Sequence, residues 1–532
     1  MRPPNPVRLR WAAGLVATAI GTVAVAQPTG APPGGSPTSP STTAARSDTP
    51  VAAPADTPID LGTALRLAGA ENPELLLARQ RVTEAAAVRQ LAAVQVLPNL
   101  NVGGNFNLHR GPVQQSNGNI LRVNRDALYL GLGAGAIGSG TVSVPGLNYN
   151  LNVGEAWYGW LAARQRVVTA GAAAAAVRNE VLLRVCLAHL DLVRGDARVA
   201  VAVRNRAEAS EVARLTDEYA KAGQGRKADA DRAAVEVRRR DAELAQAEGD
   251  ALAAAARLAQ LLNLDPALRL RSAEGWAVPA PVVPDALPLP ELLAVALLQR
   301  PELAARRSEV RQTLYELSLA KVLPFSPTVI LGFSAGGFGG GSNLVSSPQG
   351  FVGGDGKRVT AARFSDLDGR TDFDAAVLWT VRNLGVGNVA IARAADSRAT
   401  QARLRELDAM NRVRAEVAEA HARVAARAKQ IDAAEKAVRS SGDAYAADLT
   451  RIKGGQGLPL EVMDSLRLLA RSRFDYLDAI VDYNRAQFQL WVALGNPPAD
   501  VLSRPIPREV IDVPPGPRVL PIPRAIPLPG RP

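Results

Sequence analysis

The 532-residue sequence is poor in the residues that build disulfide frameworks, metal sites and bulky cores. It contains one cysteine, Cys186, which excludes a disulfide framework and lies in an apolar helical stretch typical of a small core residue. Its three histidines, His109, His189 and His421, lack the spacing of metal ligands or of a catalytic triad. Aromatic residues make up only 4%, which favours long, closely packed helices. We therefore expect neither an enzyme nor a cofactor.

Long apolar runs are absent after residue 27, so no membrane-spanning helix is expected and any membrane insertion must use strands. Residues 1–27 begin with Arg2, Arg8 and Arg10, continue with an apolar run and end in small residues. This pattern predicts a cleaved secretory signal peptide. Its removal would lower the formal net charge of +11 by three.

The other basic residues are interleaved with acidic ones at helical spacing, as in "RAAVEVRRRDAELAQAE" at residues 232–248. Such spacing is typical of a solvated, ion-paired helix surface rather than a nucleic-acid groove. The run from Arg238 to Arg240 is accordingly expected at the surface. No nucleic acid is expected as a partner.

Proline-rich stretches divide the sequence. They predict a linker over residues 28–58, an inter-repeat linker over 276–290 and a tail over 499–532. The two segments between them, 59–275 and 291–498, resemble each other. Aligning them places Pro73 over Pro301 and Pro98 over Pro324, and their Gly-Gln-Gly motifs also coincide. We therefore predict a duplicated unit of ~230 residues.

Each repeat shows the same order of patterns: a short helix, a longer helix, strands, a very long helix, a glycine break and a returning helix. Nothing between Asn388 and Lys453 forbids a helix, and that length would reach ~100 Å. Large residues recur on it every seven positions, which predicts left-handed supercoiling against neighbouring helices. They are Val417, Val424, Ile431, Val438 and Tyr445, repeated in the first half by Val185, Leu192 and Val199.

Four strands are predicted, over residues 99–108, 147–153, 328–335 and 372–381. Apolar residues alternate in them with mostly uncharged polar ones, which suits a strand with lipid on one side and water on the other. A soluble sheet with one solvated face would show a similar pattern. The Gly-rich segment 332–343 lacks the ending of a phosphate-binding loop and is expected to be an exposed loop. The water-facing positions would be Asn99, Asn101, Asn105, Asn107, Asn148, Asn150 and Asn152.

Four strands cannot close a barrel in a membrane, because an open edge leaves backbone groups without hydrogen-bond partners in hydrocarbon. Several copies would have to share one barrel. Two chains would supply eight strands and three would supply twelve, and only the larger barrel leaves a water-filled lumen.

Taken together, these patterns resemble the TolC-like outer membrane factors. The resemblance covers nearly all of residues 59–498 and rests on the predicted signal peptide, the two repeat openings at 64–82 and 292–310, a helix that closes on Leu-Pro before a strand, and a glycine break six residues before an acidic position. It implies a mainly α fold with a β-barrel section: two tandem repeats of long helical hairpins plus two strands each. Three chains would form one α-barrel and β-barrel tunnel.

The implied function is that of a passive exit duct in the outer membrane, with the helices in the periplasm. Its partners would be outer membrane lipid, a periplasmic adaptor protein and an inner-membrane efflux pump or ABC exporter of a tripartite efflux or type I secretion system. No catalysis is implied. A non-conducting periplasmic coiled-coil scaffold is the alternative.

The resemblance also assigns roles to the glycine breaks. Gly223-Gln224-Gly225 and Gly455-Gln456-Gly457 would form the hairpin turns at the periplasmic tip, where positive φ favours glycine. The adaptor-docking candidates are Gly223, Gly225, Gly455, Gly457, Leu458 and Pro459. They could equally be turn formers alone.

Acidic residues that follow the tip glycines line the closed periplasmic entrance in the family. The matching positions here are Glu461 and Asp464 in the second repeat and Asp229 in the first, whereas Arg232 departs from the pattern. Three-fold symmetry would gather these carboxylates into a ring that attracts cations. Acidic residues at a helix start are also favoured by the helix dipole alone.

Overall fold

The computed structural model of the protein describes residues 56–114, 118–135, 142–274, 277–284, 287–342 and 367–498. The predicted signal peptide over 1–27, residues 28–55 of the predicted linker and the predicted tail over 499–532 lie outside these ranges. The described residues of the inter-repeat linker contact the helices: Ala277 and Val283 belong to two different buried apolar clusters, and the side chain of Asn484 donates a hydrogen bond to the oxygen of Val278 at 2.8 Å.

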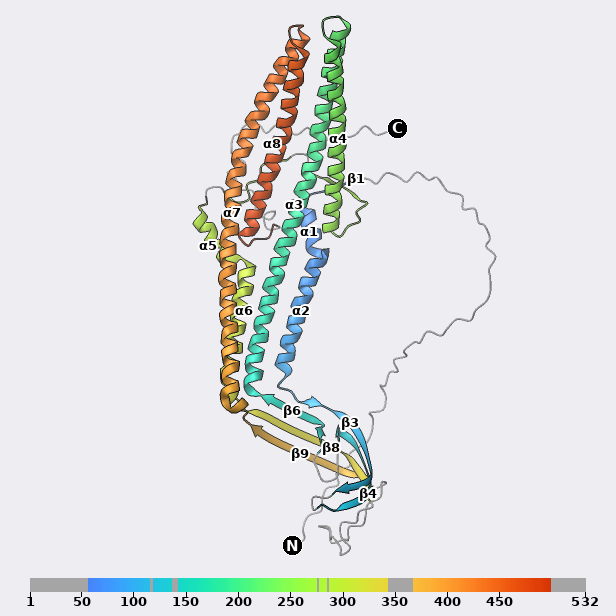
Figure 1. The fold of residues 1–532 in the computed structure, drawn as a ribbon, viewed down its shortest axis with the longest axis vertical. Helices are drawn as coiled ribbons and strands as arrows, with labels where there is room; N and C mark the ends of the chain where they lie inside the picture. Colours follow the sequence, from blue (N-terminus) through green and yellow to red (C-terminus); the bar gives the residue numbers. More distant parts are fainter. Residues whose placement is uncertain are drawn as a thin grey trace, which may run out of the picture. The chain divides into compact units, whose positions relative to one another are not determined.

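The helices confirm the predicted duplication, because each helix of the first repeat has a counterpart of nearly equal length in the second (Figure 1). The pairs have 11 and 11, 22 and 22, 69 and 68, and 35 and 35 residues. The first-repeat helices are α1 (Leu61–Glu71), α2 (Pro73–Val94), α3 (Val153–Lys221) and α4 (Lys227–Leu261). The second-repeat helices are α5 (Leu289–Gln299), α6 (Pro301–Val322), α7 (Val386–Lys453) and α8 (Pro459–Ala493).

Local sequence explains where these helices begin. Asp60 and Asn72 cap α1 and α2, since their side chains accept hydrogen bonds from the backbone N–H of Thr63 and Glu74 at 3.2 and 2.9 Å. Pro73 and Pro301 occupy the first position of α2 and α6, where a missing N–H costs nothing. Short 3-10 turns, Leu323–Phe325 and Arg382–Gly385, join the helices to the strands.

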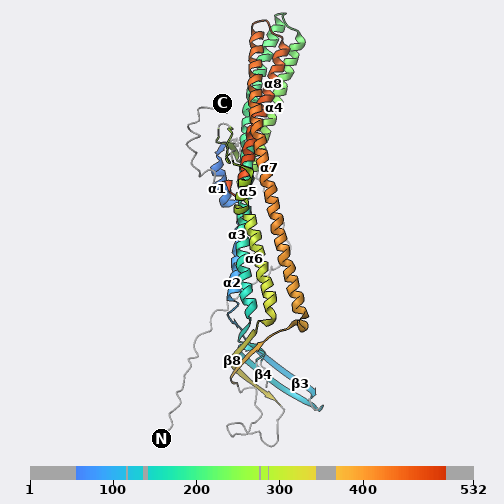
Figure 2. The same cartoon turned by 90° about the vertical axis from the view of Figure 1, so that its left-hand side faces the viewer.

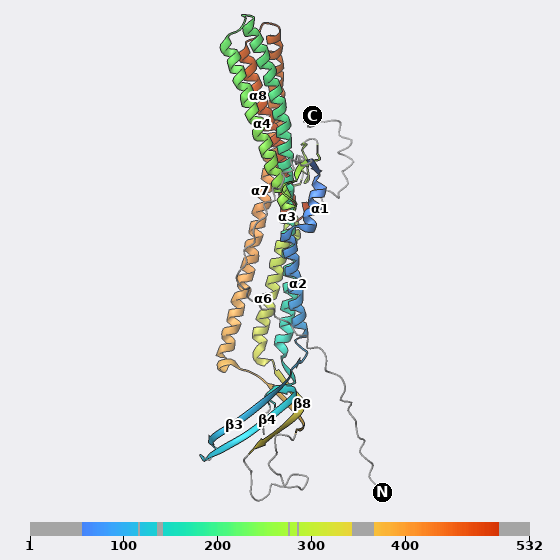
Figure 3. The same cartoon turned by 90° about the vertical axis from the view of Figure 1, so that its right-hand side faces the viewer.

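The long helices α3 and α7 run through the whole helical part (Figures 2 and 3). The shorter helices α2, α4, α6 and α8 pack against them, so that each half of the helical part is a row of four helices that includes α3 and α7. On the side of the strands the order is α2, α3, α6, α7; on the side of the glycine turns it is α4, α3, α8, α7. In the first row α2 and α7 are the outer members, and in the second α4 and α7.

The predicted seven-residue seam of α7 is its buried face. Val417 is completely buried, Val424, Val438 and Tyr445 are nearly so, and Ile431 is half-buried against two apolar clusters. Val185 and Leu192 repeat this on α3, where Cys186 is also buried. Each such Val or Leu contributes roughly 1.5–3 kcal/mol by burial. The small seam positions let the helices approach closely: a Cβ at Gly195 would lie 2.9 Å from the Cα of Ala251 on α4.

Among the described residues, seven strands of different lengths form one antiparallel sheet. Because some of these strands follow one another in line, the sheet is four strands wide. The first position holds β2 (Asn99–Leu100) and β3 (Val102–Gln114), and the second holds β4 (Ile120–Ala134) followed by β6 (Leu147–Asn152). Next come β8 (Thr328–Ser342) and β9 (Asp368–Leu378). The short strand β5 (Val144–Pro145) pairs with the end of β4. Separately, β1 (Asp56–Ile59) pairs in parallel with β7 (Arg269–Ser272).

Two sequence expectations about the sheet are wrong. The Gly-rich segment 332–343 is not an exposed loop, because residues up to Ser342 continue β8. A Cβ at Gly336 or Gly340 would lie 2.5 or 2.3 Å from a backbone oxygen of β4, so glycine allows the two strands to approach. Three of the predicted strands are longer than the 7 to 10 residues expected, since β3, β8 and β9 have 13, 15 and 11 residues, whereas β6 has 6; β4 was not predicted at all.

Candidate functional site

The two glycine turns close the helical hairpins α3–α4 and α7–α8 at the end farthest from the sheet (Figure 1). Their hydrogen bonds match: the N–H groups of Gln224 and Gly225 donate to the oxygen of Tyr219, and those of Gln456 and Gly457 donate to the oxygen of Arg451. The four distances lie between 2.9 and 3.1 Å. The duplicated sequence has thus kept one turn geometry in both repeats.

The glycines of these turns serve two different purposes. Gly223 and Gly455 both have φ of +74°, a conformation that favours glycine. The expectation of positive φ is wrong for Gly225 and Gly457. Glycine is needed there for space, since a Cβ at Gly457 would lie 2.8 Å from the backbone nitrogen of Ile452.

The second turn also exposes apolar side chains. Leu458 is 63% exposed and Leu460, which sequence reasoning missed, is 46% exposed. Pro459 is buried at the first position of α8, so its side chain is not exposed as its two neighbours are, and its role in docking stays a prediction. The corresponding positions of the first turn are Arg226, Lys227 and Ala228, which makes the two tips chemically different.

Of the three predicted gate carboxylates, Asp229 and Glu461 lie in the first turns of α4 and α8 and Asp464 lies one turn further along α8, and each pairs with an arginine. Glu461 lies 3.5 Å from Arg451, Asp464 lies 3.3 Å from Arg467, and Asp229 lies 3.0 Å from Arg232. Asp464 and Glu461 have side chains that are 66% and 43% exposed, against 18% for Asp229. The second-repeat carboxylates are therefore the more available to solvent and cations.

A buried charge network connects this acidic region to the first hairpin. Glu236 of α4 accepts hydrogen bonds from Arg240 at 2.7 Å and from Arg467 of α8 at 2.9 Å, and Arg467 also pairs with Asp464. Glu236 and Arg240 are 3% and 5% exposed. The expectation that the whole run Arg238–Arg240 lies at the surface is therefore wrong for its last residue. The burial of Arg240 could have been predicted from the sequence only through the 3.6-residue period of the helix, which turns one of three consecutive residues toward the neighbouring helix.

Further ion pairs bind α3 to α8 along their length. Arg473 donates to Glu208 at 2.6 and 2.9 Å and to Asn205 at 2.7 Å. Farther from the tips, Arg198 donates to Asp478 at 2.5 Å. Close to Glu208, burial raises the pKa of Tyr445 to about 12, and the nearby carboxylate acts in the same direction. Polar contacts therefore hold the two hairpins side by side.

Two further contacts join the hairpins at the tips themselves. The Tyr219 hydroxyl donates to the backbone oxygen of Ile452 at 2.5 Å. Lys453 lies 4.0 Å from Glu211, whose pKa is lowered chiefly by hydrogen bonds from Arg214 and further by the charges of Arg214 and Lys453. Both contacts depend on side chains at the ends of α3 and α7.

At the other end of the helices, the sheet has one continuous apolar face. Residues paired in register share a face, so Val102, Phe106, Leu130, Phe373 and Val377 lie on the same side across the sheet. Their side chains are between 55% and 74% exposed. An exposed apolar surface of this extent marks contact with a membrane or another chain.

The predicted asparagines lie on the opposite face, but several have local hydrogen-bonding roles. Asn101 donates to the oxygen of Pro145 at 2.8 Å, and Asn105 accepts from the backbone N–H of Gly135 at 2.8 Å. Asn152 is the last residue of β6 and half-buried, and its side chain caps α3 and bonds to Ser326; its water-facing role stays a prediction. Asn99 and Asn148 face each other in register, Asn150 is exposed, and the Nδ2 of Asn107 is buried without a partner.

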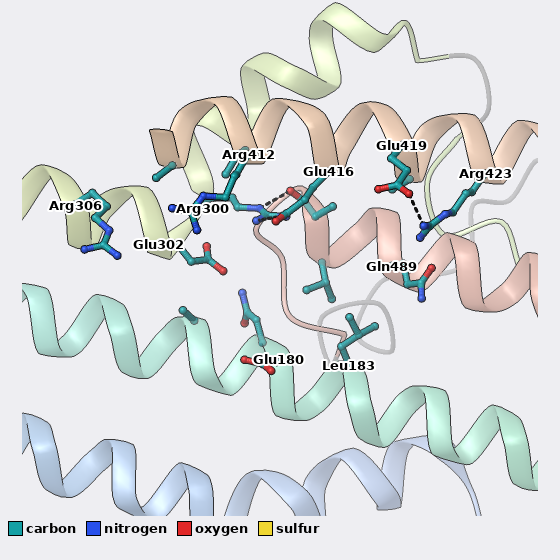
Figure 4. A pocket seen from close by; sticks show the side chains of 17 residues that line it. Glu180, Leu183, Arg300, Glu302, Arg306, Arg412, Glu416, Glu419, Arg423 and Gln489 are labelled. Carbon is teal, nitrogen blue, oxygen red and sulfur yellow. Dashed lines mark hydrogen bonds and ion pairs between the residues drawn. The ribbon is translucent and has the colours of Figure 1, made fainter. Parts of the chain in front are cut away.

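A pocket of about 490 Å³ lies where the end of α8 meets the start of α6, between α3 and α7 (Figure 4). Arg300 crosses it, donating to the oxygen of Ala493 at 2.7 Å and pairing with Glu416 at 2.6 Å. Glu180 and Glu302 also point into the space (Figure 4). These charged side chains lie at the junction where α8 ends and α6 takes its place between α3 and α7.

Within the described ranges, no group of three or more His, Cys, Asp or Glu side chains could hold a metal ion. The helices in those ranges include none that is long and apolar enough to cross a membrane. His189 is buried, with Nε2 3.3 Å from the oxygen of Ile59, and so belongs to the packing of β1 against α3.

Comparisons with known proteins agree with this architecture. Residues 64–264 match the model of the outer membrane efflux protein family. Three solved structures share the fold across 82% of this chain. The outer-membrane channel OprN is 20% identical with a TM-score of 0.64, over 89% of its own chain. The CmeC outer membrane channel of Campylobacter jejuni is 15% identical with a TM-score of 0.65, over 85%. The outer membrane protein VceC of Vibrio cholerae is 16% identical with a TM-score of 0.63, over 96%. None of the curated proteins matches the sequence at a significant level.

Proposed function

We propose that this chain, whose residues 64–264 match the model of the outer membrane efflux protein family, forms an exit duct in the outer membrane. The observation that carries the proposal is the exposed apolar face of a sheet whose outer strands, β3 and β9, each have one unpaired edge among the strands described. Open edges in hydrocarbon are costly, so such a sheet requires more copies of itself to close.

The arrangement of the helices supports closure between copies. In both helix rows α7 is the outer member on one side, and α2 or α4 on the other; in the sheet the outer strands are β9 and β3. Joining the β9 side of one copy to the β3 side of the next would keep all strands antiparallel, because β3 and β8 run in one direction and β4 and β9 in the other. The same contact would place α7 against α2 and α4.

Three copies are the number that we propose. Each chain supplies four strand positions, so three give twelve, which leaves a water-filled lumen where eight would be filled by side chains. The helices would continue this lumen as a twelve-helix tunnel, since four helices lie side by side at every level. At 1.5 Å per residue, α3 alone extends it by ~100 Å into the periplasm.

In this proposal the duct is passive and no catalytic step occurs in the chain. A periplasmic adaptor would dock at the turns, using the exposed Leu458 and the backbone around Gly223 and Gly455, and an inner-membrane pump or ABC exporter would supply the energy. Glu461 and Asp464 would form a ring of carboxylates at the entrance. The proline-rich segment 276–290 would link the two repeats.

The competing function, a periplasmic scaffold, is disfavoured by the exposed apolar face of the sheet, which a soluble protein would have to bury. Purified full-length protein added to a planar lipid bilayer separates the two. Discrete conductance steps are expected for the duct. A protein that stays soluble without detergent and gives no conductance would favour the scaffold.

A further inference from the structure

The hairpin formed by β3 and β4 extends beyond the other strands described. The last residue of β8, Ser342, pairs with Arg125 of β4, whereas β3 and β4 continue to pair from there to Gln114 and Ile120. This extension lies at the end of the sheet away from the helices (Figure 3). It therefore faces the outside of the cell if the helices are periplasmic, an orientation that rests on the proposed function.

Basic residues continue the apolar face of the sheet onto this extension. Side chains alternate along a strand, so Arg110 lies on the same face as Phe106 and Leu108. Register pairs Pro112 with Arg122, which places Arg122 on that face as well. Phe106 and Leu108 are 56% and 45% exposed, and both arginines are exposed.

The position of these arginines along the strand matches the boundary of a membrane. A tilted strand crosses the hydrocarbon in about 9–11 residues. The stretch from the start of β2 at Asn99 to Leu108 contains ten residues, and Arg110 follows two positions later. Arg110 and Arg122 occupy diagonal positions on the two strands, which brings their Cα atoms to about 7–8 Å from each other. The carboxylate of Asp126, on the same face, accepts a hydrogen bond from the N–H of Gly341 at 2.7 Å.

We propose that Arg110 and Arg122 bind the phosphate groups of lipid headgroups in the outer leaflet. Two guanidinium groups that border an apolar surface fit the phosphate of a lipid whose chains cover Phe106 and Leu108, because guanidinium binds phosphate through paired hydrogen bonds. The contact would anchor the duct at a fixed depth.

The same hairpin provides a matched control. Arg125 is exposed and pairs in register with His109, so it lies at the same level of the hairpin but on the opposite face, away from the lipid. A non-specific effect of positive charge would involve all three arginines equally. Binding to lipid through one face would involve only Arg110 and Arg122.

The test measures lipid bound to the purified full-length protein by native mass spectrometry, with phosphatidylglycerol and phosphatidylcholine as probes. Each of Arg110→Ala and Arg122→Ala is expected to weaken phosphatidylglycerol binding about 5-fold, and the pair about 30-fold. Arg125→Ala should bind as wild type. Inorganic phosphate at equal concentration should not compete.

Three outcomes would overturn the proposal: wild-type binding by the double variant, an equal loss with Arg125→Ala, or full competition by inorganic phosphate. Conductance of the same preparations in planar bilayers keeps the two proposals apart. If the wild-type protein conducts normally and the double variant still binds lipid, the lipid site is refuted and the proposed duct is not. Absence of conductance in wild type would refute the duct whatever the lipid result.

Discussion

The hydroxyl of Tyr219, two residues before the end of α3, lies 2.5 Å from the backbone oxygen of Ile452 in the second hairpin. The bond joins the tips of both hairpins in one chain. Its phenol ring also lies near the second turn, since a Cβ at Gly455 would be 3.5 Å from the hydroxyl oxygen. The position of one tip therefore depends on the other.

Replacing Tyr219 by Phe removes this bond and keeps the ring. A net loss of about 0.5–1.5 kcal/mol is expected, because the oxygen of Ile452 keeps the hydrogen bond that it accepts from the N–H of Gly455 at 3.1 Å. With the tie removed, the tips should separate more readily and the open-channel probability in planar bilayers should rise. Unchanged thermal stability and unchanged channel opening would show that the bond does not constrain the tips.

Replacing glycine by alanine is expected to have opposite effects on stability at Gly455 and at Gly249. Gly455→Ala should destabilise the second hairpin by about 1–2 kcal/mol, because alanine is strained at φ of +74°. Gly249→Ala lies in the interior of α4, where a Cβ meets no atom within 4 Å, and should stabilise by about 0.5–1 kcal/mol. Chemical denaturation of both variants checks the pair, and a shift of equal sign would contradict the turn geometry.

Two neighbouring arginines of α4, one buried and one exposed, are expected to differ in their contribution to stability. Arg240→Met leaves the carboxylate of Glu236, which is 3% exposed, with one partner fewer, and should cost about 3–5 kcal/mol. Arg239→Met changes a neighbouring side chain that is 67% exposed and should stay within about 0.5 kcal/mol. The free energy of unfolding of both variants is the measurement that compares them. Similar values for both variants would mean that the Glu236 network contributes little.

Much of this architecture can be predicted from the sequence, and the reasons are local. The seven-residue period from Val417 to Tyr445, the N-cap at Asn72 and the two Gly-Gln-Gly motifs specify helices and turns without distant partners. The strands are harder, because β8 depends on glycines that only make sense once β4 lies against them. Likewise, Arg240 looks like its exposed neighbours until α8 brings Arg467 to Glu236.

The carboxylates at the tip remain a prediction that function must test. Glu461→Gln with Asp464→Asn should reduce cation selectivity and raise leak, because a ring of like charges attracts cations and resists closure. Asp475→Asn, farther along α8 and 63% exposed, is the control that should leave both unchanged. Reversal potentials in asymmetric salt provide the measurement. Identical selectivity in the double variant and wild type would remove both residues from the entrance.

One copy has too few strands to seal a pore, so several copies must combine their strands around a shared lumen. The number of chains in the complex can be measured by native mass spectrometry of the full-length protein released from detergent micelles. We expect a complex of three chains that requires detergent to stay in solution. A stable single chain, soluble in plain buffer, would show that no shared barrel forms.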